Sequence, residues 1–132
     1  MKDTLGDIGE GIAEVELNVR KEEISKYLGV PPERLFIEYT GREKGEVDFK
    51  IHQDSDKGTV LAIVEVKTST CGEIEQLLSS AEDQLRERFS NNYKNLEHGF
   101  AVAILIGDVE KLIQTGAEYK FKMNYFRNPY KK

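Results

Sequence analysis

Three residues carry the clearest chemical signal in the sequence: Asp48 in the segment GEVDF, and the pair Glu65 and Lys67 in the segment VEVKT. Residues i and i+2 of a β-strand share a face, so Glu65 and Lys67 are expected to point the same way. If the strand of Asp48 lies beside them, two carboxylates and an ammonium group converge. Such a set suits Mg²⁺ or Mn²⁺, because one or two carboxylates hold such a cation while water and phosphate oxygens complete its coordination.

A cation held in this way would serve phosphate chemistry. It lowers the pKa of a bound water and neutralises charge that develops on a phosphate, while a nearby lysine orients the water or contacts the phosphate. Lys67 is placed for that role. The alternative is a surface ion pair at a strand end. Five apolar residues precede Glu65, however, so the pair is expected near buried surface, where an unpartnered charge is costly.

The strands that must position these residues follow from the hydrophobic pattern. Strand-like runs at residues 35–39, 46–52 and 59–67 are separated by the turn-rich segments TGREKG and QDSDKG, which indicates an antiparallel meander. The third run is apolar on both faces up to Glu65, so it is expected at the centre of the sheet. A further apolar run, at residues 99–106, predicts another buried strand.

Helices are predicted between and around these strands. Apolar residues from Cys71 to about Phe89 are spaced for one helical face, and the order strand, helix, strand predicts a parallel pair. A helix is favoured near the N-terminus, continuing to Leu28 and ending at Gly29. A short helix is expected at residues 108–114, and an edge strand at 119–126. The predicted class is α/β, with helices flanking a central mixed sheet.

Composition limits the remaining possibilities. The 132 residues, 39% hydrophobic and 33% charged, fit a single domain over residues 1–132. No stretch approaches the roughly 18 uncharged apolar residues of a membrane helix, and the N-terminal residues lack the pattern of a signal peptide, so a cytoplasmic protein with no membrane contact is expected. Cys71 is the single cysteine, which excludes an internal disulfide, and with His52 and His98 it provides too few ligands for structural zinc.

Charge is unevenly distributed along the chain. The net charge is −5, yet residues 118–132 hold five positive residues and one negative, a net +4 that leaves −9 on the remainder. Lysines interleaved with aromatic residues suit contact with a nucleic-acid backbone and base stacking. Lysines on an edge strand also prevent sheets from pairing edge to edge, and the sequence leaves both interpretations open.

The order of these features resembles the PD-(D/E)XK nuclease superfamily, whose fold is called restriction-endonuclease-like, over roughly residues 22–107. The resemblance implies that Asp48 and Glu65 bind magnesium or manganese, that the backbone carbonyl of Val66 adds a ligand, and that Lys67 is catalytic. Many members add a glutamate from the helix before the hairpin, which here implies Glu23, with its neighbour Glu22 as the second choice. Val47 stands where the proline of the family name would precede Asp48.

Two groups in the superfamily, the Holliday-junction resolvases and the RecB-like nucleases, are the nearest in pattern. Some RecB-like members place a glutamine and an apolar residue on the following helix, which Gln84 and Leu85 resemble, although Arg88 stands where a tyrosine is expected. Thr68 and Ser69, with Thr70, are expected to cap that helix and could touch phosphate. The expected DNA contacts are Thr68, Ser69, Lys120, Lys122 and Arg127.

The resemblance implies a metal-dependent DNA endonuclease or exonuclease directed by DNA structure or by ends. A homodimer would let two sites cut two strands. The alternative is a non-catalytic module that keeps this fold and binds nucleic acid or takes part in assembly. A third class is an enzyme that acts on another phosphate compound. The sequence has no Gly-rich phosphate loop to support it.

Overall fold

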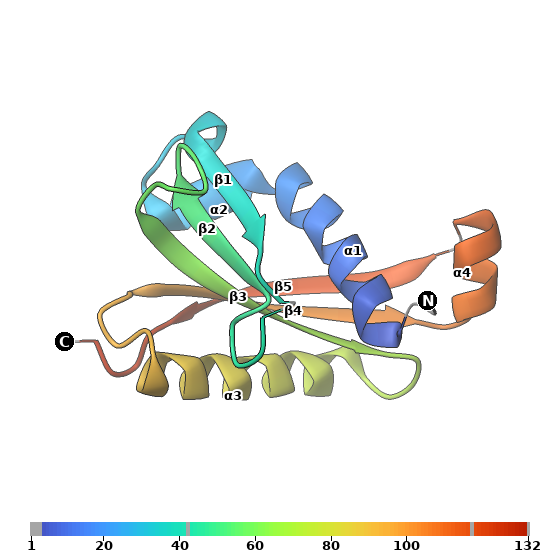
Figure 1. The fold of residues 1–132 in the computed structure, drawn as a ribbon. Helices are drawn as coiled ribbons and strands as arrows, with labels where there is room; N and C mark the ends of the chain where they lie inside the picture. Colours follow the sequence, from blue (N-terminus) through green and yellow to red (C-terminus); the bar gives the residue numbers. More distant parts are fainter. Residues whose placement is uncertain (1–3, 42, 117, 132) are drawn as a thin grey trace.

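The structure is a computed structural model that describes residues 4–41, 43–116 and 118–131. It is an α/β fold in which four helices surround one five-stranded sheet (Figure 1). In chain order the elements are α1 (Leu5–Val19), α2 (Lys21–Leu28), a 3₁₀ turn η1 (Pro32–Arg34), β1 (Leu35–Tyr39), β2 (Phe49–Gln53), β3 (Val60–Ser69), α3 (Ile74–Asn91), β4 (His98–Ile106), α4 (Val109–Thr115) and β5 (Tyr119–Arg127).

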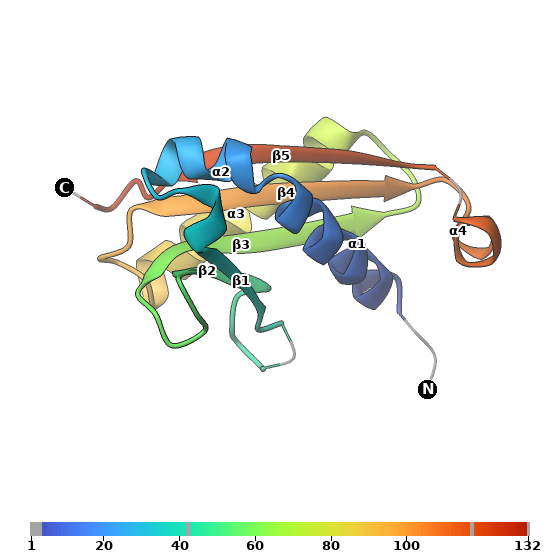
Figure 2. The same ribbon diagram turned by 90° about the horizontal axis from the view of Figure 1, so that it is seen from above.

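The strands lie side by side in the order β1-β2-β3-β4-β5 (Figure 2). The first three form the predicted antiparallel meander, with β3 in the centre. Helix α3 then returns the chain so that β4 runs parallel to β3, and β5 completes the far edge antiparallel to β4. The mixed sheet, the central third strand and the edge position of the last strand are thereby confirmed.

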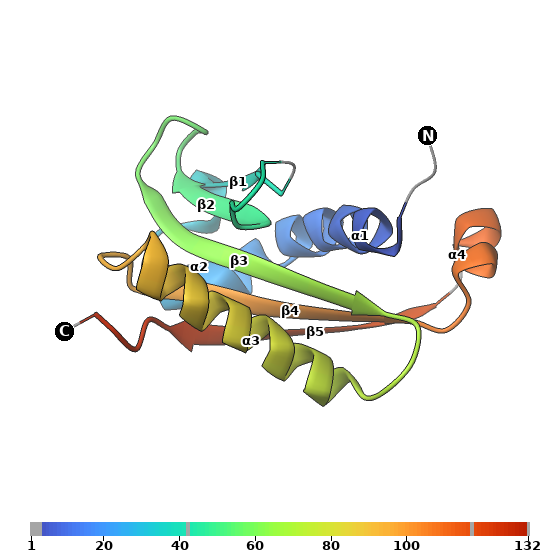
Figure 3. The same cartoon turned by 60° about the horizontal axis from the view of Figure 1, so that its bottom comes forward.

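Helices cover both faces of the sheet, α1 and α2 on one side and α3 on the other (Figures 1 and 3). Alternation along β3 divides the core between them. Ala62, Val64 and Val66 pack in the cluster beneath α1 and α2, while Ile63 packs with the apolar side of α3. Glu65 has the same parity as Ile63 and turns toward α3. Within the described ranges, no helix combines the length and apolar character needed to cross a membrane.

Two elements begin about three residues later than the sequence predicts. Strand β2 begins at Phe49 rather than at residue 46, so Asp48 precedes the strand instead of lying within it. Helix α3 begins at Ile74, because Gly72 adopts a left-handed backbone (φ 91°) that interrupts the helix. Its N-cap is Glu73, which makes no side-chain capping bond, so the predicted hydroxyl cap at residues 68–70 is wrong. The Ser69 hydroxyl instead donates to the carbonyl oxygen of Cys71 at 2.8 Å.

A glycine on α1 sets how closely that helix approaches the sheet. Gly9 is buried, and a Cβ atom added there would lie 1.8 Å from the Oγ1 atom of Thr68 on β3. Only a residue without a side chain fits this contact. The next residue, Glu10, is therefore held close to the C-terminal half of β3.

We expect Gly9→Ala to lower the free energy of unfolding by about 1–3 kcal/mol, because α1 or Thr68 must shift to relieve the overlap. Gly11→Ala is the matched control on the same helix, since nothing lies within 4 Å of its added Cβ. Because alanine has a higher helix propensity than glycine, Gly11→Ala should raise the free energy of unfolding by up to about 1 kcal/mol. Urea unfolding of both variants measures the difference, and an equal effect of the two substitutions would contradict the close contact.

Candidate active site

Asp48 lies where β2 separates from β3. The ladder between the two strands ends at Phe49 opposite Val64, and beyond it the Asp48 Oδ2 atom accepts a hydrogen bond of 2.7 Å from the Val66 N–H. The Asp48 side chain thus takes the place of a backbone carbonyl as the partner of β3, just before β2 begins. Thr40 fixes this segment, because its N–H donates to the Asp48 carbonyl at 2.9 Å and its hydroxyl donates to the Val47 carbonyl at 2.7 Å.

Glu65 lies beside Asp48 and is almost entirely buried, with 1% of its surface exposed. Its carboxyl group is hydrogen-bonded to that of Asp48. Arg88 on α3 donates from Nε to the Glu65 Oε1 atom at 2.9 Å. The structure therefore brings together Asp48 and Glu65, as the sequence predicts, and adds an arginine that directly contacts one of them.

A third carboxylate comes from α1. Glu10 is hydrogen-bonded to Asp48, and the Tyr39 hydroxyl donates to the Glu10 Oε1 atom. Glu23, the residue that the resemblance implies, lies exposed on α2 with Glu22, and neither contributes to the hydrogen bonds of Asp48. Sequence reasoning did not identify Glu10. The available signal was its position between Gly9 and Gly11, since small residues let a helix approach a sheet.

Crowding shifts the protonation of all three acids. Burial raises the pKa of Asp48 to about 7, with the charge of Glu65 as the next cause, and the Val66 N–H opposes the shift. Burial also raises the pKa of Glu65, against hydrogen bonds from Asp48 and Arg88. The pKa of Glu10 is raised by burial as well. Near neutral pH, Asp48 therefore holds a proton in part of the molecules.

The donor set fits a hard cation that keeps part of its water shell. Glu10, Asp48 and Glu65 form a hydrogen-bonded chain, and across the part of the chain that the structure describes no three His, Cys, Asp or Glu side chains could hold a metal ion by themselves. Two carboxylates plus water are the usual protein ligands of Mg²⁺. In addition, the N–H and C=O of a strand residue point to the same side, so the Val66 carbonyl is directed toward Asp48.

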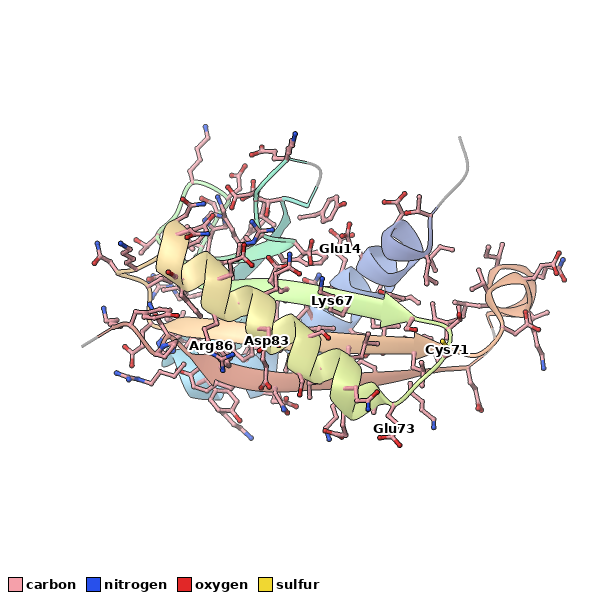
Figure 4. All side chains as sticks on the ribbon, turned by 90° about the horizontal axis from the view of Figure 1, so that it is seen from below. Glu14, Lys67, Cys71, Glu73, Asp83 and Arg86 are labelled. Carbon is pink, nitrogen blue, oxygen red and sulfur yellow. The ribbon has the colours of Figure 1, made fainter. Side chains whose placement is uncertain are left out.

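Lys67 lies two residues beyond Glu65 on the same face of β3 and is half-buried. Figure 4, viewed from the α3 side, shows it on a stretch of β3 that α3 leaves uncovered. Gln84 lies one helical turn before Arg88 on α3 and is half-buried.

The other predicted DNA contacts lie on β3 beyond Lys67 and on β5. Thr68 packs against Gly9, and β5 is separated from β3 by β4. On β5, Lys120 is exposed, whereas Lys122 pairs with Glu75 and Arg127 with Glu97. Aromatic residues alternate with these charges along β5. Tyr119, Phe121 and Tyr125 pack against the core on the side of α1 and α2, and Phe126 packs against the core on the side of α3.

Comparison with protein families, curated proteins and solved structures finds no match for this chain. The chemical interpretation of the site therefore depends on its own geometry.

The raised pKa of Asp48 predicts how stability changes with pH. The folded protein holds this proton more tightly than the unfolded chain, so the stabilisation is complete below about pH 4 and is lost as the pH rises through about 7. In EDTA, unfolding free energies at pH 5 and pH 8 should differ by at most about 4 kcal/mol from this source. Asp48→Asn should remove most of that difference.

Asp83→Asn is the matched control, because Asp83 is exposed on α3 and pairs with Arg86 at 2.8 Å (Figure 4). It should keep the pH dependence of the parent protein. Denaturant titrations across this range measure both variants. If Asp48→Asn kept the full pH dependence, the buried acid pair would not be its source.

Proposed function

We propose that this protein is a Mg²⁺-dependent nuclease that hydrolyses phosphodiester bonds in DNA. The observation that carries the proposal is the pair of half-buried Asp48 and buried Glu65, which lies beside Lys67 where β2 leaves β3. The succession of helix, antiparallel meander, crossover helix and parallel strand supports a restriction-endonuclease-like fold. A substrate selected by DNA structure or ends, and a homodimer that cuts both strands, remain part of the proposal.

The residues divide the proposed reaction among them. When bound, the cation supplies an activated water and neutralises charge on the phosphate. Asp48, Glu65 and the Val66 carbonyl are its proposed ligands, and the two acids give up their shared proton as it binds. Lys67 orients the attacking water or contacts the phosphate from the uncovered stretch of β3. Tyr39 orients Glu10, which in turn holds Asp48.

Cleavage assays test this proposal directly. Labelled single-stranded, duplex, flapped and branched DNA should be cut with Mg²⁺ or Mn²⁺ and left intact with EDTA. Glu65→Gln and Lys67→Gln should each lower the cleavage rate about 10²-fold or more, because each removes a group that stabilises the reacting atoms. Glu10→Gln should lower it less, since Glu10 acts through Asp48.

Glu14→Gln is the matched control for Glu10→Gln, because Glu14 is exposed one turn further along α1 (Figure 4). It should cleave like the parent protein. Glu65→Gln protein that cut as fast as the parent would contradict the assignment.

One observation favours the alternative, a non-catalytic module that binds nucleic acid or takes part in assembly. Arg88 already supplies a positive charge to Glu65, at a position where the resemblance would place a tyrosine. A protein of this kind would bind DNA in a strongly salt-dependent manner and would not cut it with any divalent cation.

A further inference from the structure

Arg88 is fixed at two points, by one member of the acid pair and by the segment that leads into the other. Its Nε atom donates to Glu65 on β3 at 2.9 Å, and its Nη1 atom donates to the carbonyl of Gly45 at 2.7 Å. The first partner is a buried carboxylate, and the second belongs to the segment that leads into Asp48. A single guanidinium therefore joins α3, β3 and the segment before β2.

The charge of Arg88 compensates a carboxylate that water barely reaches. The side chain of Glu65 is 2% exposed and that of Arg88 is 20% exposed. Removing one member of such a pair leaves an uncompensated charge in a buried position. While no divalent cation is bound, Arg88 thus lowers the energetic cost of an ionised Glu65.

Backbone geometry and hydrogen bonds fix the segment before β2. Gly45 adopts a left-handed backbone (φ 81°), which places its carbonyl in a turn. The next residue, Glu46, accepts hydrogen bonds from the Tyr93 hydroxyl and from the Val47 N–H. The position of Asp48 consequently depends on contacts with α3 and with the loop that follows it.

We propose that Arg88 is a positioning residue that sets the affinity of the acid pair for a divalent cation. Its guanidinium holds Glu65 and Gly45 in the cation-free protein, and an arriving cation competes with it for the Glu65 carboxylate. Arrival of a cation thus loosens the tie between α3 and the segment of Asp48. This inference rests on the proposed function in so far as it requires a divalent cation at Asp48 and Glu65.

The test measures Mn²⁺ affinity by electron paramagnetic resonance of free Mn²⁺ at pH 8, a readout that does not require activity. Arg88→Gln removes the competing charge and should bind Mn²⁺ at least tenfold more tightly than the parent. Arg86→Gln is the matched control, because Arg86 is exposed on α3 and pairs with Asp83 (Figure 4). Its affinity should stay within about twofold of the parent.

Circular dichroism in EDTA shows whether Arg88→Gln folds without a cation. If it does not, Arg88→Lys replaces it, with Arg86→Lys as the control. Lysine keeps the charge but cannot present the planar fork that reaches Glu65 and Gly45 together, so we expect an affinity about threefold above the parent. A purely structural arginine would lower the melting temperature without raising the affinity.

The outcomes separate this inference from the proposed function. Equal Mn²⁺ affinity in the parent and the Arg88 variant, abolished by Glu65→Gln in both, would overturn the role of Arg88 and leave the cation site standing. If neither the parent nor the Arg88 variant bound Mn²⁺ in a way that Glu65→Gln abolishes, both the role of Arg88 and the proposed cation site would be overturned.

Discussion

Two neighbouring carboxyl groups, that of buried Glu65 and that of half-buried Asp48, impose the constraint on which the rest of the site depends. Asp48 and Glu65 cannot both be ionised in this position without a nearby positive charge, because burial and mutual repulsion disfavour two negative charges. Neighbouring groups stabilise the two carboxyl groups. The Val66 N–H binds Asp48, and Arg88 binds Glu65. A proton shared by the pair, or the proposed cation in its place, satisfies the remaining imbalance.

The pair lies just beyond the end of a short strand. Because β2 begins only at Phe49, the backbone of Val66 on the longer β3 extends past its neighbour and meets a side chain instead of a strand. Thr40 and Arg88 hold the segment before β2 from opposite sides. The position of Asp48 beside β3 thus depends on the length of β2, on the contacts of the preceding segment and on electrostatics.

Local patterns were sufficient to predict the strands and the two main acids. The apolar run before Glu65 can be buried on both faces only in a central strand, and alternation along that strand fixes the side to which Glu65 and Lys67 turn. The predicted order of helix and parallel strand also follows from such patterns. These features depend on residues that are close together in the sequence.

The features that sequence reasoning missed depend on contacts between distant segments. Glu10 reaches Asp48 only because Gly9 lets α1 approach Thr68, and the resemblance that suggested Glu23 began beyond that helix. The pattern of β5 indicated an edge strand, but not that its aromatic residues pack against both core clusters. The hydroxyl cap failed because Gly72 delays the start of α3.

The central claim is that Asp48 and Glu65 together hold a divalent cation. The most direct measurement is X-ray diffraction from crystals soaked in Mn²⁺ at pH 8, with anomalous scattering recorded to locate manganese. We predict an anomalous peak within bonding distance of both carboxylates and of the Val66 carbonyl. Crystals whose manganese peaks all lay elsewhere, with the two carboxyl groups still hydrogen-bonded to each other, would contradict it.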